Sequence, residues 1–284
     1  MTPPESRPGI LYIVATPIGN LADLSPRARA TLASVDLIAA EDTRHTRQLL
    51  QACGLEKAMT ALHEHNEAHK SEELVAQLLS GRSVALVCDA GTPLISDPGF
   101  DLAAAARARG VEVAAVPGPC AAIAALSVAG LPTDRFVFEG FTPAKSAARR
   151  QRLQALADET RTMIFYEAPH RLAEFMKDME SEFGAERRAV VARELTKRFE
   201  TSYAGSLREL RERVERDPDM SRGEIVVVVA GAEPRPALAA QIDADQLLRA
   251  LLEELPPSQA ARIAAKATGL KRSQLYERAQ ALRR

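Results

Sequence analysis

Residues Val84–Gly99 read VALVCDAGTPLISDPG. The apolar run VALVC has the length and composition of a buried β-strand. It ends at Asp89, and glycine, proline, threonine, serine and a second aspartate follow. A connection from a buried strand to a helix usually needs only about two to six residues. This stretch therefore predicts a strand whose carboxyl end carries an unusually rigid and polar loop.

Similar apolar runs alternate with helical patterns through the first half of the chain. Within the helical segments, Ser25 suits an N-cap with Pro26 as the first helical residue, and Gly54 and Gly110 are suited to end helices. Strands buried on both faces read as continuous apolar runs, so the alternation predicts a mostly parallel sheet. The runs are Ile10–Ala15, Val35–Ala40, Val84–Cys88 and Val111–Val116.

The remainder of the chain divides into two further parts. A polar, proline-bearing break at Leu131–Asp134 is followed by a second α/β pattern with hairpin-like spacing, which predicts a mixed sheet. A linker-like stretch follows Gly231, and residues 243–284 contain only helical patterns. We expect three parts: an α/β domain at 1–131, a second α/β domain at 132–234, and a linker with a small helical module at 235–284.

Composition excludes several classes of protein. The 284 residues are 46% hydrophobic, with a net charge of −1, so a nucleic acid would have to be met by a local basic patch. The three cysteines lack metal-ligand or CxxC spacing, which indicates buried thiols in a reducing compartment. The N-terminus lacks the apolar core of a signal peptide, and no apolar run reaches the roughly 20 residues of a membrane span. We expect a cytoplasmic protein that does not bind a membrane.

Polar and small residues follow each predicted strand. In open α/β sheets the ligand lies outside the carboxyl ends of the strands, so these loops would meet around one site. Taken singly, each is equally well an ordinary turn. Neither GxGxxG nor GxxxxGK[ST] occurs, which argues against a ligand held by its phosphates. A nucleoside carrying an amino acid suits such a cleft better, but the pattern alone does not name it. The loops begin at Thr16, Glu41, Asp89, Pro117 and Tyr166.

Six segments together resemble one family over nearly the whole chain from Ile10. They are ATPIGNLADLSPRA, AEDTRHTRQLL, DAGTPLISDPG, VPGPCAAIAAL, YEAPHR and ARELTKRFE. The family is ribosomal RNA small subunit methyltransferase I, within the tetrapyrrole methylase superfamily. The resemblance implies two α/β domains with S-adenosylmethionine in the cleft between them, in a homodimer. It also implies 2′-O-methylation of a cytidine ribose in 16S ribosomal RNA, with that RNA or the small ribosomal subunit as partner.

The resemblance also implies which residues contact the cofactor. The loop Asp89–Ser96 would wrap it, and its prolines would hold the loop in shape beforehand. Asp89 would either bond the ligand or fix the loop amides. The start of a helix near Cys120 would offer free N–H groups, and the second domain would supply the other wall. The predicted cofactor-binding residues are Pro17, Asp89, Gly91, Thr92, Ile95, Ser96, Cys120, Ala121, Ala122, Tyr166, Glu167, Leu195, Gly223 and Ile225.

Methyl transfer depends mainly on alignment, with a base to remove the hydroxyl proton. Four candidates for the base stay open: Glu41, Asp42, Glu167 and His170. The His63-Glu64-His65 cluster is better explained as a polar loop than as a metal site, and we expect no metal.

Basic residues concentrate around Lys145–Arg152 and from Arg262 to the end of the chain. A basic helix is commonly just a solvated face, but beside an RNA methylase core we expect phosphate contacts. The terminal helices resemble a helix-turn-helix module with its turn at Thr268–Leu270. The predicted RNA-binding residues are Arg44, Lys145, Arg149, Arg150, Arg171, Lys197, Lys271 and Arg272.

Two alternatives stay open. One is the same fold acting on a tetrapyrrole or on a modified histidine of a protein. The basic terminal module argues against it, as does the absence of the glycine-rich first loop that is typical of porphyrin methylases. The other is a non-catalytic RNA-binding protein that keeps an unused cleft.

Overall fold

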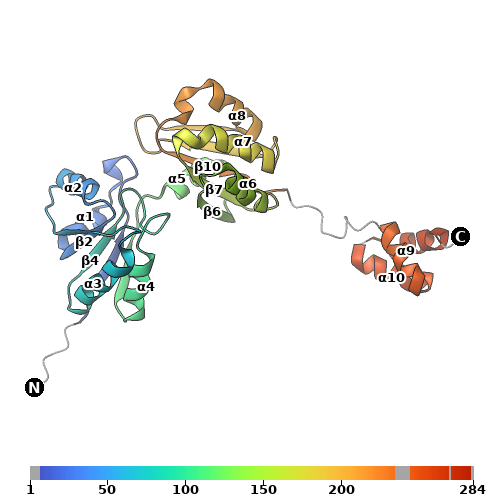
Figure 1. Cartoon of the computed structure of the whole chain (residues 1–284), viewed down its shortest axis with the longest axis horizontal. Coiled ribbons are helices and arrows are strands. Elements are labelled where there is room, and N and C mark those ends of the chain that lie inside the picture. Colours follow the sequence, from blue (N-terminus) through green and yellow to red (C-terminus); the bar gives the residue numbers. More distant parts are fainter. Residues whose placement is uncertain (1–6, 234–243, 269, 283–284) are drawn as a thin grey trace, which may run out of the picture. The chain divides into compact units, whose positions relative to one another are not determined.

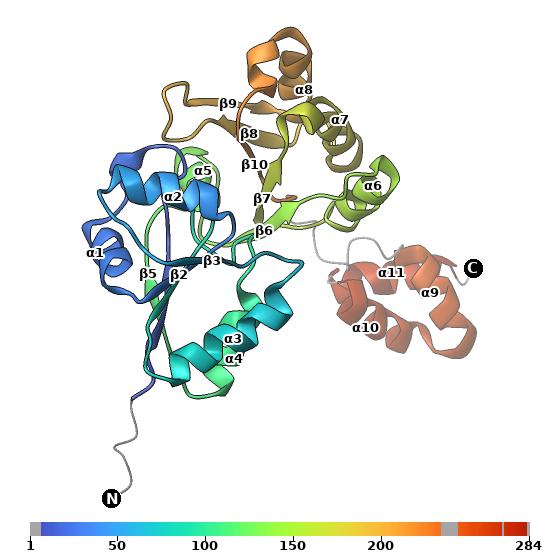
Figure 2. The ribbon, with the colours of Figure 1, turned by 60° about the vertical axis from the view of Figure 1, so that its left-hand side comes forward.

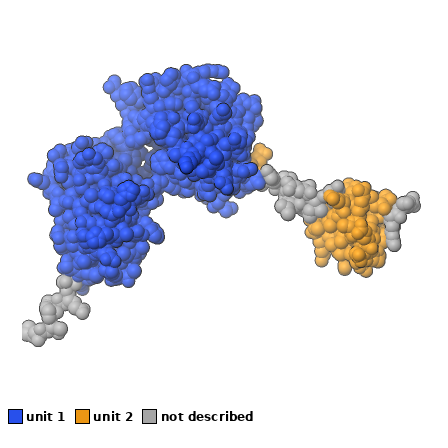
Figure 3. All heavy atoms as spheres, viewed as in Figure 1, with its two compact units in different colours: residues 1–231 blue, residues 232–284 orange. Residues whose placement is uncertain are grey.

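The computed structural model describes residues 7–233, 244–268 and 270–282. The chain divides into two compact units, residues 1–231 and 232–284 (Figure 3). Residues 234–243, which hold most of the predicted linker, and Gly269 of the predicted turn lie outside the described residues. Among the described residues, no helix is both long enough and apolar enough to cross a membrane.

The first unit contains two five-stranded sheets with helices around them (Figures 1 and 2). The strands of the first sheet are β1 (Ile10–Val14), β2 (Leu37–Ala40), β3 (Met59–Ala61), β4 (Val84–Val87) and β5 (Glu112–Val116). Its accompanying helices are α1 (Pro26–Ser34), α2 (Thr43–Ala52), α3 (Glu67–Leu79), α4 (Phe100–Ala108) and the short η1 (Leu21–Asp23).

The first sheet is fully parallel, in the order β3-β2-β4-β1-β5. Successive residues of β4 face opposite sides. Val84 and Leu86 pack with α3 and α4, whereas Ala85 and Val87 pack with α1 and α2. This two-sided burial explains the continuous apolar run and confirms the expected parallel sheet. The edge strand β3 was not located from the sequence.

The helices around the first sheet begin and end at the predicted capping residues. The Ser25 hydroxyl accepts a hydrogen bond from the Ala28 N–H at 3.0 Å, and Pro26 is the first residue of α1. Gly54 and Gly110 lie just past α2 and α4 with φ of 68° and 74°, a conformation that glycine adopts without strain. These predictions are confirmed.

The second sheet is mixed, in the order β6-β7-β10-β8-β9, with only the β6–β7 pair parallel. Its strands are β6 (Phe136–Phe141), β7 (Thr162–Glu167), β8 (Arg188–Arg193), β9 (Thr201–Ser206) and β10 (Ile225–Val229). The associated helices are α6 (Ser146–Ala155), α7 (Leu172–Phe183), α8 (Leu207–Arg216) and the short η2 (Pro169–Arg171) and η3 (Pro218–Ser221). Helices α6 to α8 cover one face.

Helix α5 (Ala121–Val128) joins the two sheets. It follows β5 of the first sheet, yet Ala122, Ala125 and Leu126 pack against Ile164 and Val228 on the open face of the second. The helix thereby places the loop after β5 beside the second sheet.

The second unit consists of α9 (Ala244–Glu254), α10 (Pro257–Thr268) and α11 (Arg272–Leu282). Its core is built from small residues and leucines, with Leu248, Ala261, Ala264 and Leu275 fully buried. The expected three-helix module is confirmed.

Candidate functional site

The loops after β1 and β4 are fastened to each other at the carboxyl edge of the first sheet. The Thr16 N–H donates to the Gly91 carbonyl at 2.8 Å, and the Gly91 N–H donates back to the Thr16 carbonyl at 3.1 Å. The Thr92 hydroxyl donates to the Pro119 carbonyl in the loop after β5 at 2.9 Å. Because β1 and β4 are neighbours in the sheet, their loops meet where open α/β sheets bind ligands.

The far end of the loop after β4 is anchored by a buried carboxylate. Glu67 Oε1 accepts hydrogen bonds from the N–H groups of Gly99 and Asp101, at 2.9 and 2.8 Å. Gly99 has φ of 124°, and a Cβ at this position would overlap the Leu86 side chain. The loop of the opening stretch is therefore fixed at both ends without any ligand.

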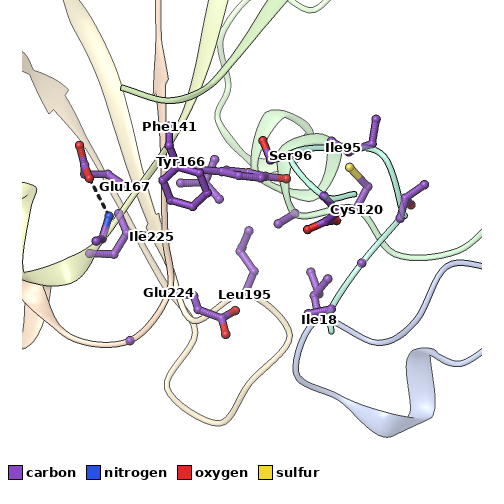
Figure 4. Close-up of a pocket in the computed structure, with 18 of the residues that line it drawn as sticks. Ile18, Ile95, Ser96, Cys120, Phe141, Tyr166, Glu167, Leu195, Glu224 and Ile225 are labelled. Atoms are coloured by element: carbon purple, nitrogen blue, oxygen red, sulfur yellow. Dashed lines mark hydrogen bonds between the residues drawn. The ribbon is translucent and has the colours of Figure 1, made fainter. Parts of the chain in front are cut away.

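A pocket of about 340 Å³ lies between this loop, the start of α5 and the second sheet (Figure 4). This volume is near the lower end of small-molecule sites, which span about 300–1,000 Å³. Apolar and small residues form most of the walls. The lining residues are Ile18, Ala90, Gly91, Thr92, Ile95, Ser96, Asp97, Cys120, Ala121, Phe141, Tyr166, Glu167, Ala168, Pro169, Leu195, Gly223, Glu224, Ile225 and Val226.

Tyr166 ties the two sides of the pocket together. Its hydroxyl accepts a hydrogen bond from the Ala122 N–H in the first turn of α5, at 3.1 Å. Its ring meets those of Phe138 and Phe141 edge to face, with centroids 5.0 and 5.5 Å away. Burial raises the pKa of Tyr166, so the phenol stays neutral and keeps its proton.

Two apolar residues of the pocket each have a residue with strained backbone on both sides in the sequence. Among the described residues, only four non-glycine residues have positive φ: Leu94, Ser96, Glu194 and Thr196. They flank Ile95 on one side of the pocket and Leu195 on the other. Such conformations cost about 1–3 kcal/mol each and persist where the surroundings over-determine them, often at functional sites.

Two of the carboxylates lining the pocket have cationic partners. Glu167 Oε1 lies 3.1 Å from Arg171 Nε, and its Oε2 accepts from the Thr142 hydroxyl at 3.3 Å. Burial raises the pKa of Glu167, although the Ala168 N–H and Arg171 oppose the shift. Glu224 Oε1 lies 3.1 Å from Lys197 Nζ at the more exposed rim.

The third pocket carboxylate, Asp97, has no cationic partner among the described residues. Burial and the nearby carboxylates of Glu41 and Asp89 raise its pKa to about 6, while a hydrogen bond with the Cys88 thiol opposes the shift. The Cys88 thiol is buried and its pKa is raised, so it stays protonated, and its Sγ donates to the carbonyls of Ala90 and Gly91 at 3.4 and 3.5 Å.

A second polar cluster surrounds the end of β2, next to the pocket but outside its lining. Asp89 accepts a hydrogen bond from the Asp42 N–H at 3.1 Å and lies 2.9 Å from His45 Nδ1. Asp89 raises the pKa of His45, and Arg44 lowers the pKa of Asp42 through a salt bridge of 2.6 Å. Burial raises the pKa of Glu41.

Comparison with known proteins places this geometry in a family. Residues 10–211 match the model described as Tetrapyrrole (Corrin/Porphyrin) Methylases, and residues 238–283 match the RsmI C-terminal HTH domain. A Xylella fastidiosa (strain Temecula1) protein named ribosomal RNA small subunit methyltransferase I is 58% identical, covering 95% of this chain and 99% of the relative. A protein of the same name from Pseudomonas aeruginosa is 54% identical, covering 95% and 96%. The chain belongs to the ribosomal RNA small subunit methyltransferase I family.

Solved structures related to this family member share its fold at low identity. Diphthine synthase matches with a TM-score of 0.59 and 15% identity, covering 78% of this chain and 90% of that one. A uroporphyrin-III C-methyltransferase from Thermus thermophilus, complexed with S-adenosylhomocysteine, matches with a TM-score of 0.53 and 17% identity, covering 78% and 97%. The expected architecture of two α/β sheets of tetrapyrrole methylase type with terminal helices is confirmed.

Most of the residues predicted to contact the cofactor meet in the pocket of this ribosomal RNA small subunit methyltransferase I family member. They are Gly91, Thr92, Ile95, Ser96, Cys120, Ala121, Tyr166, Glu167, Leu195, Gly223 and Ile225. Pro17, Asp89 and Ala122 do not line it. Ala122 is buried beneath Tyr166, and Asp89 orients Asp42 and His45. The binding roles themselves stay predictions.

The four predicted bases are not equivalent in the structure. Glu167 lines the pocket but is paired with Arg171, whereas Glu41 and Asp42 lie in the adjacent cluster. Asp42 is the N-cap of α2, where its side chain accepts from the Arg44 N–H. His170 is exposed on η2 and does not line the pocket.

The basic residues predicted to bind RNA fall into exposed and internally paired groups. Lys145, Lys271 and Arg272 are exposed. Arg44 and Arg150 are also exposed but form salt bridges, with Asp42 at 2.6 Å and with Glu182 at 2.9 Å. Arg171 and Lys197 are mostly buried in ion pairs at the pocket.

The prediction that Arg149 binds RNA is wrong, because this side chain is buried. The side chain is 1% exposed and lies inside the second sheet's helical layer. Its Nε donates to Asp178 at 2.7 Å, and its other nitrogens contact Glu174 and the Ala144 carbonyl. A buried guanidinium needs these partners, so its charge holds α6 on α7 and is not presented to a phosphate.

Several pocket residues were missed from the sequence. They are Ile18, Asp97, Phe141, Ala168, Pro169 and Val226. Asp97 stands within the loop already singled out, and its loop position was the available signal. The pairing register of β6 shifts between Phe138 and Gly140, which changes the face on which Phe141 lies. The sequence around Phe141 does not indicate this shift. Within the described ranges, no group of three or more potential ligands could hold a metal.

Proposed function

We propose that the protein transfers a methyl group from S-adenosylmethionine to the 2′-hydroxyl of a cytidine in 16S ribosomal RNA. The observation that carries the proposal is the match to relatives named ribosomal RNA small subunit methyltransferase I over 95% of the chain. The pocket supports it, because its loops come from both sheets and form one apolar cavity with few polar groups.

The residues present fit an adenosyl compound. Gly91 lines the pocket with φ of 91°, a left-handed conformation that suits glycine, so the wall at this point is bare backbone. Cys120 provides no side-chain cap for α5, and the Ala122 N–H is taken by Tyr166, so the N–H groups of Ala121 and Ile123 at this helix start are the ones that could meet a carboxylate. Ile18, Leu195 and Val226 provide apolar contact surface.

The contribution of the chain would be mainly alignment and a dry environment. Bound S-adenosylmethionine supplies an electrophilic methyl group on a positively charged sulfur. The loop from Asp89 to Gly99 is fixed before binding, and Tyr166 fixes the opposite wall through α5. Pre-set positions of this kind lower the entropic barrier to bringing a hydroxyl in line with the methyl group.

RNA binding would involve the second unit and the exposed face of α6. Residues 238–283 match a helix-turn-helix model. Arg262 and Lys266 are exposed on α10, and Lys271 and Arg272 are exposed where α11 starts. Lys145, the N-cap residue of α6, is also exposed. Contacts of this kind position an RNA through its phosphates without reading its sequence.

We further propose a homodimer that works in the cytoplasm, where ribosomal subunits are located. The exposed apolar side chains of α5, Ile123 at 50% and Val128 at 52%, are candidates for coverage by a second copy. Light scattering coupled to size-exclusion chromatography tests this, and a monomeric mass at micromolar concentration would contradict it.

Two measurements test the function against the alternatives. Calorimetry with S-adenosylmethionine should give one binding site, whereas a non-catalytic protein with an unused cleft gives no heat. Mapping of 2′-O-methyl groups in ribosomal RNA from cells with and without the gene should show one cytidine that loses its methyl group. Unchanged RNA, together with cofactor binding, would favour a tetrapyrrole or protein acceptor.

A further inference from the structure

Phe141 is an aromatic side chain of the pocket lining that remains 59% exposed (Figure 4). The apolar side chains of Ile18, Leu195 and Val226 elsewhere in the lining are buried. Single exposed apolar residues are common on protein surfaces, so exposure alone carries no functional meaning. Phe141 differs because the structure also fixes the orientation of its ring and places a cation close to it in the sequence.

An irregularity in β6 turns the Phe141 ring toward the pocket. Phe138 and Phe141 are three residues apart, which in a regular strand places them on opposite faces of the sheet. Because the pairing with β7 shifts register between Phe138 and Gly140, both rings instead meet Tyr166, with centroids 5.0 and 5.5 Å away. Register shifts of this kind re-aim side chains beside functional sites.

The contacts of the shifted segment hold the Phe141 ring in place before any ligand arrives. Gly140 has φ of 63°, and a Cβ there would lie 3.1 Å from the Ser96 hydroxyl oxygen, so β6 packs closely on the loop after β4. The Tyr166 hydroxyl is in turn bonded to the Ala122 N–H of α5. A ring fixed in this way can be covered by a flat ligand at little cost in conformational entropy.

The segment after Phe141 is anchored and ends in an exposed cation. Arg171 Nη2 donates to the carbonyls of Thr142 and Pro143, at 2.8 and 3.2 Å. Two residues beyond Pro143, Lys145 is exposed and has no ion-pair partner among the described residues. A fixed aromatic ring is therefore followed within four residues by a cation that can meet a phosphate.

We propose that Phe141 stacks on the base of the acceptor nucleotide while Lys145 contacts a phosphate of the same RNA strand. This inference rests on the proposed function. Proteins that recognise single-stranded RNA commonly stack unpaired bases on aromatic side chains, and phosphate contacts position the strand. The pocket of about 340 Å³ has the size of a site for one small molecule, so an acceptor nucleotide has to lie at its exposed edge.

The adenine of the cofactor is the competing occupant of the Phe141 ring. The buried walls at Ile18, Leu195 and Val226 offer an enclosed apolar surface that suits adenine better than an exposed ring does. S-adenosylmethionine also carries no phosphate that Lys145 would contact. Charge complementarity therefore favours an RNA strand on this segment.

The test compares three substitutions of Phe141 with the control Phe136→Ala. Phe136 is exposed on the same strand and does not line the pocket. Single-turnover methylation of small ribosomal subunits, at saturating S-adenosylmethionine and increasing enzyme concentration, gives a half-saturating concentration for each variant. Phe141→Ala and Phe141→Leu should raise it about 10- to 100-fold, because neither side chain can stack on a base. Phe141→Tyr, which keeps a ring, and Phe136→Ala should stay within about threefold of wild type.

Two further measurements separate the base from the other occupants. Calorimetry with S-adenosylhomocysteine should give dissociation constants within about threefold of wild type for every variant, and a loss of tenfold or more in Phe141→Leu would assign the ring to the cofactor and overturn the proposal. Lys145→Gln should lower the slope of log K against log salt for ribosomal RNA by about one, whereas Phe141→Leu should leave the slope unchanged. An unchanged slope in Lys145→Gln would remove the phosphate contact.

Failure of this inference is distinguishable from failure of the proposed function. Wild-type protein that binds S-adenosylhomocysteine but methylates no ribosomal hydroxyl would overturn both. An active wild type whose Phe141→Leu variant keeps the wild-type half-saturating concentration would overturn the stacking role alone. Phe141→Leu is the deciding variant, because an apolar side chain of similar size at an exposed position leaves the fold intact.

Discussion

Gly19 lies directly against the side chain of Lys197, and a Cβ on Gly19 would overlap Lys197 Cγ. The contact joins the loop after β1 to the loop between β8 and β9. Lys197 Nζ is held at the pocket rim between Glu194 at 3.0 Å and Glu224 at 3.1 Å. The loops of the two sheets are therefore in contact at Gly19, where the absence of a side chain leaves room for the aliphatic part of Lys197.

Gly19→Ala should destabilise the protein by about 1–3 kcal/mol and weaken binding of S-adenosylhomocysteine. The methyl group meets the lysine stem, and φ of 156° at Gly19 is unfavourable for alanine. Urea unfolding and calorimetry measure the two effects. Lys197→Ala in the same chain should recover part of both losses, and fully additive effects would contradict the contact.

Glu67→Ala should destabilise the protein by about 2 kcal/mol. The substitution leaves the N–H groups of Gly99 and Asp101 without their acceptor. Both groups donate to the same oxygen, so the side-chain carbonyl of Glu67→Gln can accept both hydrogen bonds. The glutamine variant should stay within about 1 kcal/mol of wild type, the loss reflecting the charge at the start of α3. Equal losses in urea unfolding would rule out this explanation.

The ionisation of Asp97 should lower stability as pH rises. Its pKa is about 6 in the folded protein against 3.8 as the ordinary value, so the folded state binds more protons between these limits. Stability from this group is present below pH 3.8 and is lost as pH rises through 6. Asp97→Asn should therefore raise the melting temperature more at pH 8 than at pH 4. Asp101→Asn serves as the control, and a pH-independent difference would contradict the shift.

Replacing Lys271 and Arg272 with glutamine should weaken RNA binding and reduce its salt dependence. Both side chains are exposed at the start of α11. Removal of one phosphate-binding cation should lower the slope of log K against log salt by about one. Arg278→Gln is a suitable control because its guanidinium lies 3.5 Å from Asp245. Filter binding with ribosomal RNA at several salt concentrations gives the slopes, and unchanged slopes would exclude these two cations from the interface.

Local patterns predicted most of the fold. Caps such as Ser25 and terminal glycines such as Gly54 act through their own neighbouring backbone, so the sequence reports them directly. Strand β3 was not predicted because it has only three residues, at the edge of the sheet, which are too few to produce a periodic pattern.

The site was predicted less completely because exposure and pairing depend on distant residues. Arg149 was expected on the surface, yet Asp178 lies 29 positions away in sequence and pairs with it. Asp97 stood in the loop that we singled out, but its lack of a cation follows from Arg171 and Lys197 being engaged elsewhere. Such relationships arise only when separate elements fold against each other.

The unfavourable backbone around Ile95 and Leu195 has a consequence for laboratory evolution. Glycine adopts the left-handed geometry of Leu94, Ser96, Glu194 and Thr196 without steric strain. A library selected only for heat resistance would be free to enrich glycine at these four codons. The selected variants would be more heat-resistant, but their pocket loops around Ile95 and Leu195 would be less rigid. Thermal stability and catalytic activity would therefore diverge within a few rounds.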